Sequence, residues 1–261
     1  MSDRDRPRLH VHADHRNAAV ALLDRCEDLL RRVDGDRPAR LALPTGRSYV
    51  PFYAELGARH DRDEEAPDAL NWRRATGLNL DELVLPAGHP RTFAAYMQHH
   101  VWSRTPLERS RFSIPDTSSV YGGSEAALAR LCRDVDARAA SLEPLDIALL
   151  GLGGDGHLAY NLPHQVSEET HSVELPDHLA AELEVPRAEW PLRAVTLGLG
   201  PLRRARRILL LVAGAEKAEA VRHLVEGEAD PAWPCTLLRD HSAFEVFADA
   251  AAVERLSESV C

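Results

Sequence analysis

Residues 149–164 read LLGLGGDGHLAYNLPH, and this stretch decides the fold. The run 146–150 that leads into it is short and mostly apolar, which is typical of a strand buried on both faces of a parallel sheet. Four glycines follow between positions 151 and 156, with Asp155 before the last of them and His157 directly after it. Glycines let a ligand approach the backbone closely, and ligands of open α/β sheets bind where the strands end. The stretch therefore predicts an α/β fold with a site in this loop.

The same loop contains a literal match to a dinucleotide-binding fingerprint, GLGGDG at 151–156. In that fingerprint the last glycine opens a helix. Pro163 follows seven residues after Gly156 and would interrupt such a helix. The sequence favours a different loop, in which Gly153 and Gly154 let a substrate lie against the backbone. Asp155 and His157 are one residue apart, so in an extended segment both side chains point into the site. His157 is a candidate acid or base, and His164 is a second one.

Short apolar runs alternate with segments of helical periodicity along the chain. This alternation predicts one domain over residues 1–261, an open and mostly parallel Rossmann-like sheet flanked by helices. A polar connection is expected at 60–70 and a helix after the last strand. The expected strands are 41–43, 75–80, 146–150, 194–197, 207–212 and 244–247, and the expected helices are 16–33, 49–59, 92–103, 124–140 and 217–226.

Candidate site residues follow four of these strands, at 45–48, 81–82, 151–157 and 214–217. The carboxyl ends of parallel strands share one edge of a sheet, so we expect the four segments to meet. Asp81 and Glu82 are neighbours whose side chains point different ways, so only one of them should enter the site. That carboxylate is a candidate general base, and a solvated pair at the start of a loop is the alternative.

The segment PTGRS at 44–48 lies between an expected strand and an expected helix. Small residues there expose backbone N–H groups, and a helix N-terminus adds positive potential, so the segment suits a phosphate. The alternative is a plain turn. The segment is not a Walker A loop, because the GxxxxGK[ST] spacing is missing.

The composition excludes several classes of protein. The chain has 261 residues and a net charge of −10 with scattered acidic residues, which argues against binding to duplex nucleic acid. The four cysteines lack CxxC spacing and indicate free thiols in a reducing compartment. No apolar run has the length of a membrane helix and no signal peptide is visible, so we expect a cytoplasmic protein. Of 31 basic residues only Lys217 is a lysine, which makes it either a leftover or a site residue.

No pattern typical of a metal or cofactor site is present. The histidines at 10, 12, 15, 99 and 100 fit neither HExxH nor a Cys/His ladder, and they are interpreted as surface residues. The GxSxG elbow of serine hydrolases is also missing. We expect neither a metal nor an organic cofactor, and the sequence leaves the oligomeric state open, a homo-oligomer included.

Five stretches together resemble the family of the glucosamine-6-phosphate deaminases and 6-phosphogluconolactonases. They occur in the order of the family and are LPTGRS (43–48), NLDELVLPAGHPRTFAAYM (79–97), LGLGGDGHLAYN (150–161), VTLGLG (195–200) and AGAEKA (213–218). The segment 79–97 resembles the deaminase branch. The resemblance implies the fold of that family and a small sugar phosphate as the ligand.

On this template the chain would be a deaminase or isomerase that opens an amino-sugar phosphate, moves a proton between C2 and C1, and releases ammonia. His157 would assist ring opening, Asp81 would carry the carbon-bound proton, and Asp155 would assist at the amino-bearing carbon. The resemblance places the phosphate at Thr45, Gly46, Arg47 and Ser48 with Lys217 as its counter-charge, and adds Gly153, Gly154 and Asn161 as substrate-binding residues.

The chain departs from the deaminase pattern at Leu162, where the family has a Glu that pairs with the ring-opening histidine. His157 must then use another partner, such as His164, or act differently, and Leu162→Glu tests whether the missing carboxylate limits deamination. The segment 176–185 lacks the arginine with which the deaminases grip the phosphate, which Arg47 could replace. The segment 167–175 lacks the basic residues of the family's allosteric site, so we expect no activation by N-acetylglucosamine 6-phosphate. The alternatives are a lactonase-type hydrolase, an isomerase of another sugar on the same scaffold, and a sugar-phosphate binder without activity.

Overall fold

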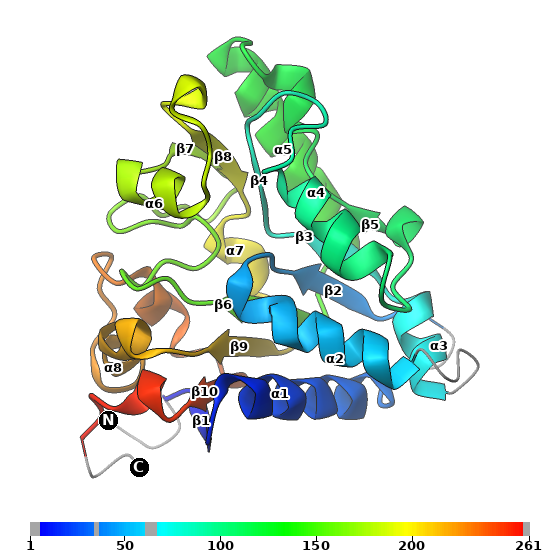
Figure 1. The fold of residues 1–261 in the computed structure, drawn as a ribbon, viewed down its shortest axis with the longest axis vertical. Coiled ribbons are helices and arrows are strands. Elements are labelled where there is room, and N and C mark those ends of the chain that lie inside the picture. The colour runs from blue at the N-terminus through cyan, green and yellow to red at the C-terminus, as the bar shows by residue number, and fades with distance from the viewer. Residues whose placement is uncertain (1–5, 34–36, 61–66, 258–261) are drawn as a thin grey trace.

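A computed structural model describes residues 6–33, 37–60 and 67–257. Its main sheet has seven strands in the order β1-β10-β9-β6-β2-β3-β5, and every neighbouring pair is parallel (Figure 1). The mostly parallel α/β sheet expected from the sequence is therefore confirmed. The strands are β1 (Arg8–His12), β2 (Arg40–Leu43), β3 (Thr76–Asn79), β5 (Phe112–Ser113), β6 (Ile147–Gly151), β9 (Ile208–Val212) and β10 (Phe244–Asp249).

Helices cover both faces of this sheet (Figure 1). They are α1 (His15–Leu30), α2 (Val50–His60), α3 (Pro67–Arg74), α4 (Phe93–Met97), α5 (Glu125–Leu142), α6 (Asp177–Glu182), α7 (Leu199–Arg203) and α8 (Ala218–Glu226). A π-helical turn, Gln98–Trp102, extends α4. Short 3₁₀ turns lie at Arg47–Tyr49, Arg109–Arg111, Thr117–Val120, Arg187–Glu189, Ala215–Lys217, Pro234–Leu238 and Ala251–Val253.

The alternation of side chains along the central strands explains the two covered faces. In β6, Ile147 and Leu149 pack with α1 and α2, while Ala148 and Leu150 pack with α5 and α8. Leu209 and Leu210 of β9 divide in the same way. Strands that are apolar on both faces need helices on both faces, which is why the sequence reads as near-continuous apolar runs here.

A second sheet of three antiparallel strands lies above the main sheet in the view of Figure 1, with α6 beside it. Its strands are β4 (Asp81–Leu83), β8 (Arg193–Thr196) and β7 (His171–Glu174), in the order β4-β8-β7. The expected strand at 194–197 is thus real, but it belongs to this sheet rather than to the parallel one. Asp81 likewise belongs to the second sheet. β3 ends at Asn79, Leu80 follows it, and β4 begins at Asp81.

Two further expectations need correction. The expected polar connection at 60–70 holds the start of α3 at Pro67, and residues 61–66 lie outside the described residues. The expected terminal helix is only the 3₁₀ turn Ala251–Val253 within the described chain. The sequence does not predict β1, β4, β5, β7, α3, α6 and α7, because two to eight residues are too few to show a clear periodicity.

The chain order of the strands places a crevice between β2 and β6. From β2 the chain continues outward to β3 and β5, and from β6 it continues the other way to β9 and β10. Such a reversal is the place where open α/β sheets bind ligands, outside the carboxyl ends of the strands.

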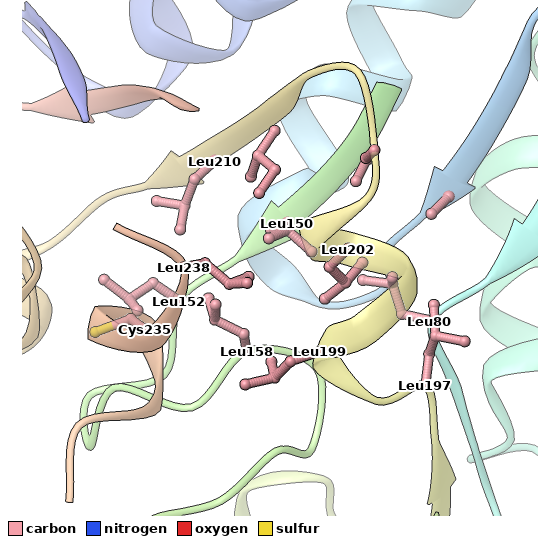
Figure 2. Packing of buried hydrophobic residues seen from close by; sticks show 14 of the residues in the cluster. Leu80, Leu150, Leu152, Leu158, Leu197, Leu199, Leu202, Leu210, Cys235 and Leu238 are labelled. Atoms are coloured by element: carbon pink, nitrogen blue, oxygen red, sulfur yellow. The ribbon is translucent and has the colours of Figure 1, made fainter. Parts of the chain in front are cut away.

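Apolar side chains anchor the loop that follows β6. Leu152 and Leu158 point from this loop into a buried cluster that includes Leu150, Leu199 and Leu238 (Figure 2). The loop between these two leucines is therefore held at both ends by the core. Among the helices that the structure describes, none is long and apolar enough to cross a membrane.

Candidate active site

A cavity of about 740 Å³ opens at the carboxyl ends of β2, β6 and β9, next to β4. All four segments that follow the predicted strands contribute to its lining, so the expectation that they meet is confirmed. They contribute Thr45, Gly46, Arg47, Ser48, Asp81, Gly151, Leu152, Gly153, His157, Glu216 and Lys217.

Asp81 faces the cavity from β4 and is 6% exposed. Its Oδ1 has no hydrogen-bond partner among the described residues. Burial, with a smaller contribution from the charge of Glu82, raises the pKa of Asp81 to about 8. A carboxylate with a free oxygen and a raised pKa can take up a proton from a bound molecule near neutral pH.

Glu82 points away from this cavity, as the alternation along a strand requires. Its carboxylate accepts hydrogen bonds from the backbone N–H groups of Leu83, Phe93 and Ala94, at 2.7 Å each. Burial raises the pKa of Glu82 to about 7, although the three N–H donors oppose the rise. Glu82 thus fixes the start of α4 to β4 and leaves Asp81 as the carboxylate of the pair that enters the site.

His157 lines the cavity, and Asp155 holds its ring. Asp155 Oδ1 lies 2.6 Å from His157 Nδ1 and also accepts the backbone N–H of His157 at 3.2 Å. Burial raises the pKa of Asp155, but the hydrogen bond and charge of His157 outweigh that effect and leave the pKa below its usual value. We expected both side chains to point into the site, but Asp155 does not line the cavity and acts through His157.

Gly153 makes room for the His157 ring. A Cβ built at Gly153 would lie 2.2 Å from His157 Nδ1, which is shorter than any real contact. A Cβ at Gly154 would lie 3.2 Å from the carbonyl oxygen of Glu216 and 4.0 Å from Lys217 Nζ. Gly154 does not line the cavity, but it lets the loop after β9 approach the loop after β6, and so positions Lys217.

The loop after β2 is held open by Gly46, whose φ of 104° favours glycine. The phenolic O–H of Tyr96 donates to the carbonyl oxygen of Gly46 at 2.8 Å. Arg47 and Lys217 both line the cavity, and neither has a carboxylate partner within the described part of the chain. The two side chains are therefore available to an anion.

Asn161, Leu162 and His164 lie outside the lining of the cavity. Asn161 is buried, and its Nδ2 donates to the carbonyl oxygens of Leu158 and Leu197. It therefore stabilises the conformation of the loop after β6 without facing the cavity. Leu162 is 1% exposed and packs in an apolar cluster with Phe93 and Tyr160. The suggested pairing of His157 with His164 is not seen among the described residues, and the partner of His157 Nδ1 is Asp155.

The sequence reading missed a second group of lining residues, which come from α4, its π-helical turn and α6. They are Arg91, Thr92, Tyr96, His99, His100, Leu179, Glu182 and Glu184. Arg91 and Glu184 form an ion pair of 2.6 Å between the two sides. His99 is exposed and His100 is partly exposed, which agrees with the expectation of surface residues, and both residues also line this cavity. The consecutive histidines 99 and 100 are the sequence signal for this group of residues. α6 has no such signal, because it does not follow a strand that the sequence predicts.

A comparison with known families matches residues 13–247 to a family described as glucosamine-6-phosphate isomerases/6-phosphogluconolactonase. The chain belongs to this family. Within it, the chain is 34% identical to a glucosamine-6-phosphate deaminase of Pseudarthrobacter chlorophenolicus, over 89% of this chain and 86% of that protein. It is 31% identical to a glucosamine-6-phosphate deaminase of Beutenbergia cavernae, over 93% and 90% of the two chains.

Solved structures of the glucosamine-6-phosphate isomerase/6-phosphogluconolactonase family have the same architecture. A monomeric glucosamine-6-phosphate deaminase superposes with a TM-score of 0.80 at 28% identity and covers 94% of this chain and 98% of its own. A 6-phosphogluconolactonase from Trypanosoma brucei reaches a TM-score of 0.78 at 20% identity, over 96% and 99% of the chains. The second likeness concerns the fold alone.

Proposed function

We propose that this protein is an amino-sugar-phosphate deaminase that converts a substrate similar to glucosamine 6-phosphate into a ketose phosphate and ammonia. The observation that carries this proposal is the pair of groups across one cavity, the buried Asp81 with a free carboxylate oxygen and His157 held by Asp155. The deaminases among the relatives, at 34% and 31% identity, support the same reaction class.

The first step is ring opening, and His157 serves it. Asp155 accepts from Nδ1, which leaves the other ring nitrogen of His157 to take the proton of the C1 hydroxyl and to give it to the ring oxygen as the bond from that oxygen to C1 breaks. C1 thereby becomes an aldehyde, and His157 returns to its starting state. In this scheme Asp155 is a positioning residue that sets the tautomer and orientation of the imidazole.

The second step moves a proton from C2 to C1, and Asp81 carries it. In its ionised form Asp81 takes the proton from C2, the C1 oxygen gains a proton, and an enol forms between C1 and C2. Asp81 then returns its proton to C1 while the amine nitrogen loses one, which leaves a hydroxyl at C1 and an imine at C2. Because burial favours the protonated form, the ionised carboxylate is a stronger base than a solvated Asp. Water then replaces the amine at C2, so that the net reaction consumes one water and yields ammonia and a ketone.

The phosphate of the substrate binds at the other side of the cavity. Backbone N–H groups of the segment Thr45–Ser48 and the side chains of Arg47 and Lys217 supply the donors and the positive charge. The left-handed backbone at Gly46 keeps this segment turned toward the cavity.

The test is ammonia release from glucosamine 6-phosphate, with the Asp81→Asn variant as the control. We expect steady ammonia release from the native protein and a loss of at least about a hundredfold in Asp81→Asn, because the amide cannot carry the proton. A cooperative thermal transition of the variant at or above the native melting temperature separates this loss from misfolding. Equal turnover by both proteins would refute the role of Asp81.

A 6-phosphogluconolactonase-type hydrolase is the second candidate, because Leu162 lacks the carboxylate of the deaminases. Hydrolysis of 6-phosphogluconolactone without ammonia release from any phosphorylated amino sugar would replace the first proposal with this one. Binding of sugar phosphates without turnover of either substrate would favour a binding protein.

A further inference from the structure

We infer that His99 and His100 form a proton-dependent part of the phosphate site, a pair of cations that is switched on when a dianion binds. This inference rests on the proposed function for the identity of the ligand, a phosphorylated sugar. Two consecutive histidines in a helix would normally point about 100° apart. Here both lie in the π-helical turn Gln98–Trp102, and both line the cavity. Wide turns of this kind are rare and occur often at functional sites.

Contacts link this pair to the phosphate loop. The ring centroids of His99 and His100 are 4.6 Å apart, and those of His100 and Tyr96 are 4.5 Å apart. Tyr96 in turn donates its O–H to the carbonyl oxygen of Gly46. The rings therefore lie next to the segment that offers its backbone N–H groups and Arg47 to the phosphate.

Acidic side chains line the cavity at α6. Glu182 ends this helix and Glu184 follows it, and Glu184 is paired with Arg91 at 2.6 Å. Glu182 therefore repels a dianion from this wall, while the cations Arg47 and Lys217 attract it to the loops that follow β2 and β9.

The surroundings of His100 favour its neutral form in the free protein. Burial, the neighbouring His99 and the charge of Arg104 lower the pKa of His100. Tyr96 on the same helix is uncharged near neutral pH, since burial raises its pKa. From the facing loops come the cations Arg47 and Lys217 and the carboxylate of Glu216.

The helix α2, which also packs against the π-helical turn, adds no free charge beside the rings. Its Glu55 forms an ion pair with Arg59, and its His60 contacts the carboxylate of Glu27. A dianion that binds next to the rings brings two negative charges to them, and it should draw protons onto them.

Sulfate is the probe for this inference, because it stays a dianion over the pH range in which phosphate itself titrates. We expect calorimetry to show sulfate binding about tenfold tighter at pH 6.0 than at pH 8.0, with proton uptake detected by repeating the titration in buffers of different ionisation heat. In the double variant His99→Gln/His100→Gln, the pH dependence and the proton uptake should both fall well below the native values, and the remainder belongs to Asp81, which lines the same cavity with a pKa of about 8. His178→Gln is the matched control, because His178 is exposed on α6 and does not line the cavity.

Kinetics give a second readout. With glucosamine 6-phosphate, the double variant should show a KM raised about tenfold and a kcat within about twofold of the native value, because the histidines bind phosphate and do not touch the reacting carbons. Unchanged proton uptake in the double variant, or a fall in kcat without a rise in KM, would overturn the inference. Failure of the proposed function is a separate result, since the sulfate titration needs no turnover.

Discussion

Leu162 stands where the resemblance to the deaminases leads us to expect a Glu, and its burial changes what a substitution there should do. The side chain is 1% exposed and packs with Phe93 and Tyr160, outside the lining of the cavity. We predict that Leu162→Glu lowers the free energy of unfolding by about 3 kcal/mol or more, because a carboxylate without a partner would enter an apolar cluster. It should give no gain in deamination, since Asp155 already occupies Nδ1 of His157.

Urea denaturation and the ammonia assay check this prediction. Leu162→Met is the matched control and should cost less than about 1.5 kcal/mol, because it conserves volume and polarity. A stable Leu162→Glu protein with raised activity would mean that the cavity can recruit residue 162 after all.

Gly153 shows how a residue without a side chain can act on catalysis. We predict that Gly153→Ala lowers kcat by about ten- to a hundredfold while the melting temperature changes little, because the new Cβ displaces the His157 ring from Asp155. The measurement is a double-mutant cycle with Asp155→Asn. If Gly153 acts through this hydrogen bond, then adding Gly153→Ala to Asp155→Asn should cost nothing more. Fully additive losses would assign the effect to another contact.

At the scale of elements, α4 depends on a carboxylate that comes from a different element. Thr92 Oγ1 accepts the backbone N–H of Ala95 at 3.2 Å, and Glu82 of β4 accepts those of Phe93 and Ala94. Four N–H groups at a helix start lack partners within the helix, so these bonds define where α4 begins.

We predict that Glu82→Ala lowers the free energy of unfolding by about 2 kcal/mol or more, because it leaves buried N–H groups without an acceptor. Glu82→Gln, which keeps one acceptor oxygen, should lose less. Urea denaturation measures both variants, and hydrogen exchange at Phe93 and Ala94 should accelerate in Glu82→Ala first. An unchanged exchange rate at these two amides would show that the carboxylate is dispensable for the helix.

The elements that the sequence predicted and those that it missed differ in a physical way. The central strands β6 and β9 are buried on both faces, so their apolar runs are visible in the sequence. β5 has two residues. β4 and β7 belong to the small second sheet, and their short sequences contain no pattern that predicts a strand. Helix α4 was expected as one helix over 92–103, but the chain changes to a π-helical turn at Gln98.

At the scale of the whole molecule, the cavity exists because four strands end at one edge, and this part of the site could be predicted. Thr45, Asp81, His157 and Lys217 each follow a strand of the expected sheet, and parallel topology was enough to bring them together. The wall formed by α6 could not be predicted, since its place depends on how β7 and β8 fold over the main sheet. The inward-facing pair at His99 and His100 depends likewise on one irregular turn.

The charge state of Asp81 also concerns the whole molecule, because it couples folding to pH. In the unfolded chain Asp81 ionises near pH 4, and in the folded protein its pKa is about 8. Between these values the folded state binds more protons, so this residue makes the native protein less stable as pH rises from 4 to 8. We predict that Asp81→Asn is more stable than the native protein at pH 8 and that this difference shrinks toward pH 4.

Melting temperatures of the two proteins across this pH range provide the measurement. Glu82, whose pKa is also raised, is present in both proteins, so its contribution cancels in the comparison to first order. A difference that stays constant with pH would mean that Asp81 is ionised in the folded protein throughout.

Lys217 has a practical consequence for experiments on this protein. The chain contains a single lysine, and its ammonium group lines the cavity. A reagent that reacts with primary amines should therefore attach at only two places, Lys217 and the α-amino group of the chain. We predict that mass spectrometry after mild acylation finds Lys217 labelled, and that inorganic phosphate slows this labelling but leaves that of the α-amino group unchanged. The composition of the chain thus provides a covalent reporter of cavity occupancy without any mutation.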